Sequence, residues 1–432
     1  MEKKRILILG AGVSGLSAAW QLSKKAKKSS LYECTLLEKN VRPGGWMGSE
    51  NREGFLVENG PRVFKTSRNA ELLEIARDLS FFSSILPSSP SANSRYLWLD
   101  GKLQKMPSGL LSLFFSLLKE LFVPPVYEDE TIWDFACRRF GRIVAERFFD
   151  PLVLGIYAGD IKKLSIDSCF SLLKMWEREK GSVVRGALIS LFKKSKKTLP
   201  FKSSLFSFKE GSGSFIQKWI SHIPFSIHLG EEIHSLQRKN GLWEAHSHNK
   251  MWEGDEVVLA LPAFVVAELL KKEAPCTSDV LRSIPYEDIT TLQIGWKGKV
   301  LPFSAFGYLV PTIEKESILG VLFDSEMFEK NYTLITIMIR GVFHREEELQ
   351  EIAKHVMLDH LKISQEPSLF FYKKMPKAIP QYVLGHQEKR DSLLSSLRQE
   401  TQNLHLVGNY LAGVSVNDSI KQAKKVIDNS FF

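Results

Sequence analysis

Near its beginning the chain reads Arg5-Ile-Leu-Ile-Leu-Gly-Ala-Gly-Val-Ser-Gly-Leu-Ser-Ala-Ala-Trp20, and this stretch decides the fold. Ile6 to Leu9 is a short, unbroken apolar run, typical of a strand buried on both faces of a parallel sheet. Gly10, Gly12 and Gly15 follow at G-x-G-x-x-G spacing. The first glycine permits a tight turn, the second lets a pyrophosphate approach the backbone, and the third lets a helix pack against the strand. The stretch therefore predicts a nucleotide-binding turn.

The residues after the turn complete a dinucleotide-binding unit. A helix from about Val13 to Ala26 would direct its N-terminal amides and its positive dipole end at phosphate groups. A second strand, Tyr32 to Leu37, ends in Glu38, roughly 20 residues beyond the glycines. A carboxylate there binds ribose hydroxyls and repels a 2′-phosphate. Together these signals predict an α/β fold built on a Rossmann-like sheet.

Composition limits the class of protein. With 432 residues, 44% of them hydrophobic, the chain is long enough for two or three domains. The four cysteines lie far apart and form no CxxC motif, which indicates a reducing compartment. The ten histidines show no zinc-like spacing, so we predict no metal site from the sequence.

The charge of the chain indicates an anionic partner. The net charge is +9 and the isoelectric point about 9.1, but no nucleic-acid-binding motif accompanies this charge, so we expect no nucleic acid partner. An acidic membrane surface or a polycarboxylate substrate is favoured instead. The chain has no uninterrupted run of eighteen apolar residues and no signal-peptide cleavage pattern. We therefore expect a cytoplasmic protein attached peripherally to the inner membrane of a bacterium.

Two segments are candidates for that attachment. Residues Gly109 to Pro125 are strongly apolar, and Val183 to Leu199 combines apolar residues with lysines at 193, 194, 196 and 197. An apolar anchor beside a lysine cluster is attracted to anionic lipid. The alternative is that both segments are ordinary buried helix with a solvated charge run. Between them, Thr131 to Phe149 is predicted as one helix whose apolar stripe faces the core.

Several further elements can be predicted from local patterns. Asp100-Gly101 and Asn240-Gly241 are typical of tight turns joining two strands. From Thr290 to Arg340, apolar runs predict a mostly antiparallel sheet. The other predictions are a helix at 67–80, a strand at 205–208 followed by a helix, a buried strand at 256–263, a helix at 346–361, and a last strand at 405–409 before a closing helix.

A loop after Glu38 resembles the FAD proteins of the amine oxidase superfamily. Arg42 stands two positions ahead of the pair Gly44-Gly45, which Trp46 follows, and Glu58 to Arg62 comes next. In that superfamily the first loop wraps the pyrophosphate of the flavin and the second passes its ring. The resemblance implies noncovalent FAD as the cofactor, and not NAD.

Four later motifs resemble the protoporphyrinogen oxidase family of the oxygen-dependent type. They are Gly155–Asp160, Phe306–Pro311, Ile379–His386 and Gly408–Asp418. The resemblance implies FAD-dependent oxidation of protoporphyrinogen IX to protoporphyrin IX in haem biosynthesis. It further implies three hydride transfers to the flavin, with the electrons passed to molecular oxygen or another acceptor. A reductase of the two-nucleotide type would need a second GxGxxG, and the sequence has none.

The resemblance also implies roles for single residues. Arg95 would pair with a propionate of the substrate, Phe306 and Leu309 would pack against the tetrapyrrole, and the backbone of Ala158 and Gly159 would face a pyrrole N–H. No residue is assigned as a general base. The implied contacts with FAD come from Gly10, Ala11, Gly12, Val13, Ser14, Gly15, Glu38, Arg42, Gly44, Gly45, Trp46, Gly60, Pro61, Arg62, Ile233, Asn409, Val414, Ser415 and Val416.

These expectations give a division into three parts. We predict a discontinuous FAD-binding domain at 1–90, 205–265 and 385–432. A substrate-binding domain with a mostly antiparallel sheet would span 91–105 and 266–384, and a helical membrane-binding region 106–204. Alternatives left open are oxidation of coproporphyrinogen III to coproporphyrin III, an amine oxidase with the same fold, and a flavin-binding scaffold without turnover. Whether the chain forms a homodimer is also left open.

Overall fold

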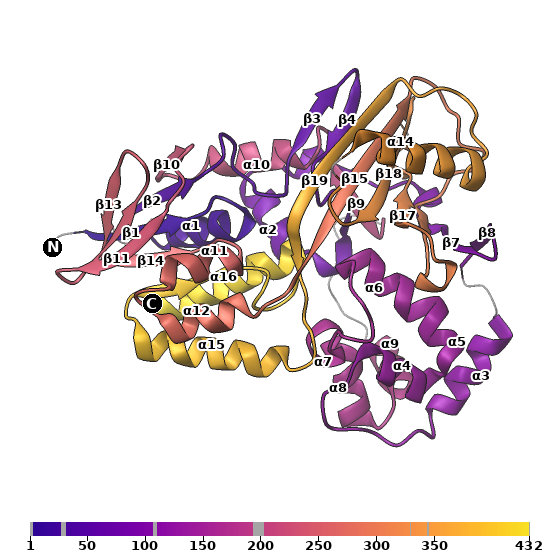
Figure 1. The fold of residues 1–432 in the computed structure, drawn as a ribbon, viewed down its shortest axis with the longest axis horizontal. Helices are drawn as coiled ribbons and strands as arrows, with labels where there is room; N and C mark the ends of the chain where they lie inside the picture. Colours follow the sequence, from indigo (N-terminus) through magenta and orange to yellow (C-terminus); the bar gives the residue numbers. More distant parts are fainter. Residues whose placement is uncertain are drawn as a thin grey trace.

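The protein is described by a computed structural model, which covers residues 3–26, 32–106, 110–192, 203–328, 330–343 and 345–431. Figure 1 shows three groups of elements: a parallel sheet with its helices at one end, a long antiparallel sheet at the other, and a cluster of helices below the second sheet. The division into domains stays a prediction.

The parallel sheet is formed by five strands in the order β10-β2-β1-β14-β20. Their bounds are β10 Ser226–Leu229, β2 Tyr32–Glu38, β1 Lys4–Leu9, β14 Glu256–Leu259 and β20 Leu404–Leu406. All neighbouring pairs are parallel. The predicted buried run is confirmed, because Ile6 and Ile8 enter the core on one face of the sheet while Leu7 and Leu9 enter the core on the other.

Helices cover both faces of this sheet. On the Ile6 face the core contains residues of α1 Val13–Ala26, α2 Ala70–Asp78, α10 Ser212–Ile220 and α16 Val416–Phe431. On the Leu7 face it contains residues of α11 Ala263–Leu270, α12 Pro275–Arg282, α15 His386–Glu400 and the antiparallel strands β11 Ser235–Lys239 and β12 Leu242–His246, which β13 Met251–Gly254 extends.

The second large sheet has seven strands in the order β19-β15-β18-β17-β16-β7-β8. Their bounds are β19 Leu369–Pro380, β15 Tyr286–Trp296, β18 Thr333–Arg340, β17 Ile318–Leu322, β16 Gly307–Leu309, β7 Arg95–Leu99 and β8 Lys102–Lys105. All pairs are antiparallel except β16 with β7. The core on one face includes α14 Glu346–His355, and the core on the other includes α6 Asp150–Tyr157.

Two smaller antiparallel sheets complete the set of strands. β3 Ser49–Arg52 and β4 Phe55–Glu58 form a hairpin, and β9 Leu205–Phe208 pairs with β5 Phe64–Lys65 and β6 Ile85–Pro87. Both predicted tight turns are confirmed: Asp100 and Gly101 have φ of 53° and 70°, and Asn240 and Gly241 have φ of 51° and 85°. Positive φ at both central residues is what such hairpin turns require.

Two predicted helices are wrong in part. The helix predicted over Thr131–Phe149 is interrupted at Gly141, whose φ of 90° ends α4 Ile132–Phe140. A short helix, α5 Arg142–Val144, and a π turn at Ala145–Phe149 then lead into α6. The helix predicted over Glu346–Leu361 likewise leaves the α conformation after His355 and continues as a π turn at Val356–His360.

Buried ion pairs hold the helix cluster together. The cluster also contains α3 Leu110–Glu120, α7 Ile166–Cys169, α8 Ser171–Lys180 and α9 Val183–Phe192. Arg139 on α4 is fully buried, 2.9 Å from Glu120 of α3 and 2.7 Å from Glu177 of α8. Glu120 also accepts a hydrogen bond from the Val183 amide at the start of α9. Removing one member would leave a buried charge without its partner, which is costly.

The two predicted membrane segments are only partly described. Gly109 and the lysines at 193–197 lie outside the described residues. Over the ranges that the structure covers, no helix is both long enough and apolar enough to cross a bilayer.

Candidate functional site

The glycine turn joins β1 to α1 through an unusually close contact. Gly10 has a φ of 99°, and its amide donates a hydrogen bond of 2.7 Å to the Leu37 carbonyl oxygen. A Cβ atom at Gly15 would overlap the carbonyl oxygen of Gly10. These two glycines are therefore required by the backbone conformation and by helix–strand packing.

Gly12, unlike Gly10 and Gly15, has space around it for a side chain. A Cβ atom at Gly12 would meet only the Cα of Gly45, at 3.8 Å, which is an ordinary van der Waals contact. The predicted glycine pair lies directly against this point, since the Gly44 amide donates a 2.8 Å hydrogen bond to the Ala11 carbonyl oxygen. Protein packing leaves space for a side chain at Gly12, and a phosphate group approaching the backbone would fill that space.

Glu38 is fixed at the carboxyl end of β2. It is buried, and its Oε2 accepts a 2.8 Å hydrogen bond from the Ala11 amide, while Oε1 accepts from the backbone amide and side chain of Asn40. The backbone around Ile233 approaches the same place, because the Glu231 amide donates to the Glu38 carbonyl oxygen at 2.9 Å. The structure thus brings the predicted ribose acid and Ile233 to the edge where nucleotides bind in such sheets.

Arg42 shapes the loop that follows. Its guanidinium donates to the carbonyl oxygens of Pro43, Gly45 and Met47 at 3.3, 3.0 and 3.1 Å. In this structure Arg42 is thus a residue that positions the glycine pair; a direct contact with a cofactor stays a prediction. Trp46, partly exposed, packs against Gly60, where a Cβ atom would overlap the Trp46 carbonyl oxygen.

Arg62 links the nucleotide-binding loop to the seven-stranded sheet. Its Nη1 lies 2.9 Å from Asp324 Oδ1 on α13 Asp324–Met327, and its side chain is almost fully buried. The adjacent Glu58 carbonyl oxygen accepts a 2.7 Å hydrogen bond from Gln293 Nε2 of β15. These two contacts fix the position of the predicted flavin loop relative to the sheet that carries the predicted substrate residues.

The last predicted cofactor segment forms the N-terminus of α16. The Ser415 hydroxyl accepts a 3.1 Å hydrogen bond from the Asp418 amide, as an N-terminal cap does. Asn409 follows β20, and its carbonyl oxygen accepts a hydrogen bond from the Tyr382 hydroxyl. Because β20 and β1 are parallel strands of one sheet, this helix begins at the same edge as the glycine turn.

Two residues of the later motifs, His386 and Tyr410, carry buried polar atoms. Tyr410 is fully buried, and neither its hydroxyl nor the Nε2 atom of His386 has a hydrogen-bond partner within the described ranges. The His386 ring stacks on Tyr382 with centroids 4.2 Å apart, and burial lowers the pKa of His386 to about 4. Unsatisfied buried groups are rare in folded proteins. Sequence reasoning assigned no role to either residue, although both lie within motifs that it singled out.

The pairing of β7 with β16 brings two predicted substrate residues together. Arg95 is opposite Gly307 in this parallel pair, and the Phe306 amide donates to the Ser94 carbonyl oxygen at 2.9 Å. The Arg95 guanidinium lies over the Phe306 ring, 4.8 Å from its centroid, and is exposed.

The other three predicted substrate residues meet between α6 and the sheet. A Cβ atom at Gly155 of α6 would lie 3.0 Å from Leu309. Ala158 ends α6 in the left-handed conformation, and its carbonyl oxygen accepts from Arg340 Nε at 3.0 Å. Gly159 packs so closely on Gln381 that a Cβ atom there would overlap the amide oxygen. Arg340 and Gln381, neither of which sequence reasoning assigned, therefore hold the Ala158–Gly159 backbone in place.

Lys65 lies within electrostatic reach of both Arg68 and Arg95. Burial lowers the pKa of Lys65, and the positive charges of Arg68 and Arg95 lower it further. Lys65 ends β5, Arg68 ends a 3₁₀ turn at Thr66–Arg68, and Arg95 begins β7. Positive charge concentrated in this way attracts carboxylates, and lysine and arginine can donate charge-assisted hydrogen bonds to them. Lys65 and Arg68 are close in the sequence, but no sequence spacing places them near Arg95, which lies on a different strand.

Comparison with known proteins identifies the family. A model described as "Flavin containing amine oxidoreductase" matches residues 13–426. The protoporphyrinogen oxidases of Bos taurus and Homo sapiens are each 29% identical to this chain, over 98% of the chain and 97% of the relative. A crystal structure from Exiguobacterium sp. 255-15, assigned provisionally as a protoporphyrinogen oxidase, shares the fold with a TM-score of 0.85 at 19% identity, and 99% of each chain is covered. The resemblance seen in the sequence is confirmed.

The space at Gly12 leads to a testable prediction. In Gly12→Val the side chain should occupy the position of the pyrophosphate, so the bound FAD should fall at least about tenfold while the chain stays folded. Flavin absorbance per polypeptide and circular dichroism measure the two effects. Gly298→Val is the matched control, because Gly298 also has no close neighbours and no positive φ. Full FAD occupancy in Gly12→Val would show that the turn is not the pyrophosphate site.

Proposed function

Because the chain belongs to the family of flavin-containing amine oxidoreductases, we propose that it is an FAD-dependent oxidase that converts protoporphyrinogen IX to protoporphyrin IX in haem biosynthesis. The observation that carries this proposal is the similarity to protoporphyrinogen oxidases, which extends over 98% of the chain. The substrate loses six electrons and six protons, equivalent to three hydrides and three protons. With oxygen as the acceptor, three molecules of O₂ would be reduced to hydrogen peroxide.

The residues at the end of the parallel sheet fit FAD. Glu38 would hold the ribose hydroxyls, Gly12 and Gly45 leave room for the pyrophosphate, and α16 directs its positive dipole end to the same edge. When bound, FAD supplies the two-electron acceptor for each hydride. The helix dipole of α16 stabilises negative charge that develops nearby.

The chain's own residues would bind and orient the porphyrinogen. Phe306 and Leu309 offer apolar surface to the tetrapyrrole, and Lys65, Arg68 and Arg95 offer positive charge to its carboxylates. Arg340 and Gln381 hold the turn at Ala158–Gly159, so that its backbone keeps one conformation. We assign no general base.

The group of three cations also favours a second candidate substrate. Protoporphyrinogen IX carries two propionates and coproporphyrinogen III four. The positive charges of Arg68 and Arg95 both act on Lys65, so these three side chains together can serve more than two carboxylates. Coproporphyrinogen III is therefore the alternative substrate for the same chemistry.

Steady-state kinetics with both porphyrinogens test this proposal. The wild-type protein should form fluorescent porphyrin, and Arg95→Ala should raise the Michaelis constant roughly ten- to hundredfold, because a charge-assisted pair contributes about 1.5–3 kcal/mol. The turnover number and the FAD content should change little. Arg95→Lys should recover part of the affinity, since lysine restores the charge but not the planar fork.

Arg52→Ala is the matched control. Arg52 is also an exposed arginine over a phenylalanine ring, 4.1 Å from the centroid of Phe371, but it lies on β3. Its Michaelis constants should equal those of the wild type. Failure of the wild type to oxidise either porphyrinogen would refute the proposed function. Unchanged constants in Arg95→Ala would refute only the role of Arg95.

We further propose that the helix cluster attaches the protein to an anionic membrane surface. Large apolar side chains are exposed on it, with Phe115, Phe122 and Leu191 at 66%, 83% and 74%. Others are Leu117, Leu118, Ile143, Leu152, Ile156, Leu172, Met175, Leu188 and Ile189. Large apolar side chains exposed in this number on one group of helices are typical of a surface that is covered in use. Figure 1 shows that α3 and α5 lie at the end of the molecule away from the parallel sheet.

Buried Glu120 connects α3 to α9. It bonds the amides of Val183 and Val184 at the start of α9 and pairs with Arg139, so α3 and α9 keep a fixed relation. A rigid pair of helices can insert several apolar side chains together, at little further cost in conformational entropy.

Vesicle flotation tests this attachment. Phe122→Asp combined with Leu191→Asp should reduce binding to anionic vesicles about tenfold or more, because two apolar anchors are lost and two repelling charges gained. The control is Met251→Asp, an exposed apolar residue on β13, at the opposite end of the molecule in Figure 1. Wild-type protein that binds neither neutral nor anionic vesicles would contradict the proposal.

A further inference from the structure

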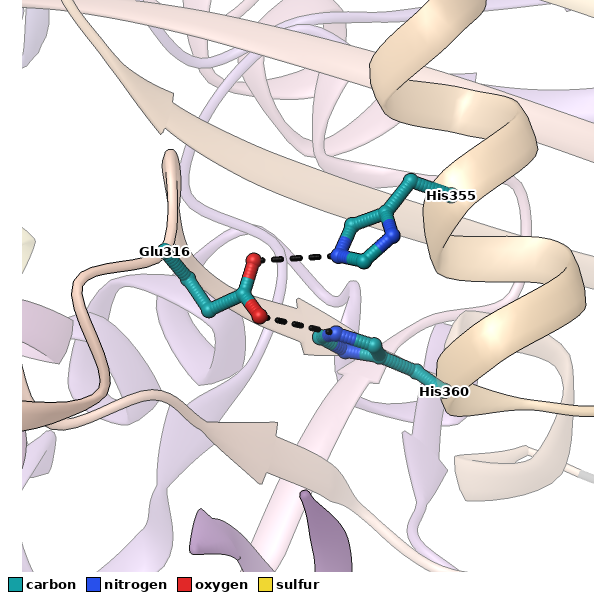
Figure 2. A group of neighbouring side chains, drawn as sticks. All are labelled: Glu316, His355 and His360. Carbon is teal, nitrogen blue, oxygen red and sulfur yellow. Dashed lines mark hydrogen bonds and ion pairs between the residues drawn. The ribbon is translucent and has the colours of Figure 1, made fainter. Parts of the chain in front are cut away.

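Three side chains meet on the α14 side of the seven-stranded sheet (Figure 2). Glu316 precedes β17, His355 ends α14, and His360 ends the π turn at Val356–His360. The Glu316 carboxylate lies 3.1 Å from His355 Nε2 through one oxygen and 3.6 Å from His360 Nε2 through the other. The three groups offer ligand atoms within 4.8 Å of one another. Both rings thus direct Nε2 at the same carboxylate.

The second nitrogen of each ring is already held by an oxygen atom. His355 Nδ1 donates to Asp359 Oδ2 at 2.8 Å, and His360 Nδ1 lies 2.8 Å from the Tyr308 hydroxyl. The His360 ring also stacks on Trp98, with centroids 3.7 Å apart. Histidines that bind metal ions usually donate their other N–H to an oxygen in this way, which fixes the ring orientation.

The Nε2 atom of His360 is buried and lacks a hydrogen-bond partner among the described residues. The whole side chain is fully buried, and the Glu316 carboxylate lies 3.6 Å from this nitrogen. A buried ring nitrogen without a partner is unfavourable. With the proton on Nδ1, the free lone pair of Nε2 points toward Glu316 and His355.

We propose that Glu316, His355 and His360 bind a divalent transition-metal ion of the zinc type. Two imidazoles and one carboxylate form a known ligand set for Zn²⁺, whereas Ca²⁺ and Mg²⁺ prefer oxygen ligands alone. Zn–N distances of about 2.0–2.1 Å place tetrahedral ligand atoms roughly 3.3 Å apart. The observed separations of 3.1 and 3.6 Å are close to this value. His355 and Glu316 are partly exposed, which leaves a path for the ion and a fourth position for water.

The site is structural and separate from the proposed substrate site. Residues 308 and 309 are neighbours on β16 and point to opposite faces of the sheet. Tyr308 belongs to the core beneath α14 and bonds His360, while Leu309 meets α6 on the other face. A bound ion would tie the end of α14 to the segment before β17. This inference does not depend on the reaction that the protein performs.

Zinc binding to untagged, chelator-treated holoenzyme tests the proposal. Isothermal titration with Zn²⁺ alone should show about one ion per chain with micromolar or tighter affinity. Glu316→Gln and His355→Gln should each weaken binding at least about tenfold, because each removes one ligand. His360 is left unchanged, since its burial against Trp98 and Tyr308 makes loss of folding a competing explanation.

Two controls separate ligand loss from general effects. Glu348→Gln removes a carboxylate from the same helix, and His222→Gln removes an exposed histidine elsewhere; both should bind Zn²⁺ as the wild type does. The FAD content of all variants shows that they are folded. A wild type that binds no Zn²⁺ in this range, or Glu316→Gln and His355→Gln with wild-type affinity, would overturn the proposal.

Discussion

A Cβ atom at Gly15 would overlap the carbonyl oxygen of Gly10, so α1 can pack across the end of β1 only because residue 15 has no side chain. This contact sets the path of the backbone through Gly12, and the Gly44 amide bonds to the same turn through Ala11. The space at Gly12, the position of Glu38 and the direction of the α1 dipole all follow from it. The proposed cofactor site depends on this contact more than on any single polar side chain.

The relation between the two large sheets depends on a few buried polar contacts. Arg62 pairs with Asp324, and Gln293 bonds the Glu58 carbonyl oxygen. The Glu58 carboxylate accepts from the Ser212 amide at the start of α10, and burial raises the pKa of Glu58. In this way one loop is fixed both to α10, which packs against the parallel sheet, and to the seven-stranded sheet. Hydride transfer requires close placement of donor and acceptor, and these contacts are what would maintain it.

Local signals made much of the fold predictable. The buried run at Ile6–Leu9 and the turns at Asp100-Gly101 and Asn240-Gly241 are specified by neighbouring residues, and the structure has all of them. The break at Gly141 and the π turn at Val356–His360 were missed because a 3.6-residue period assumes a regular helix. The same π turn explains why the pairing of His355 with His360 was not predicted. In a regular α-helix, five positions amount to about 1.4 turns, so the two rings would point in different directions. The cations beside Arg95, and the contacts of Arg340 and Gln381, arise only when distant strands and helices meet.

Anaerobic titration of the FAD-loaded protein with a porphyrinogen tests the central claim most directly. Each porphyrinogen gives up three pairs of electrons, and each FAD accepts one pair. The account predicts that one molecule of protoporphyrinogen IX or coproporphyrinogen III bleaches the flavin absorbance of three protein molecules, and that porphyrin appears in the same proportion. Flavin that stays oxidised with both porphyrinogens but is bleached by an amine would contradict it.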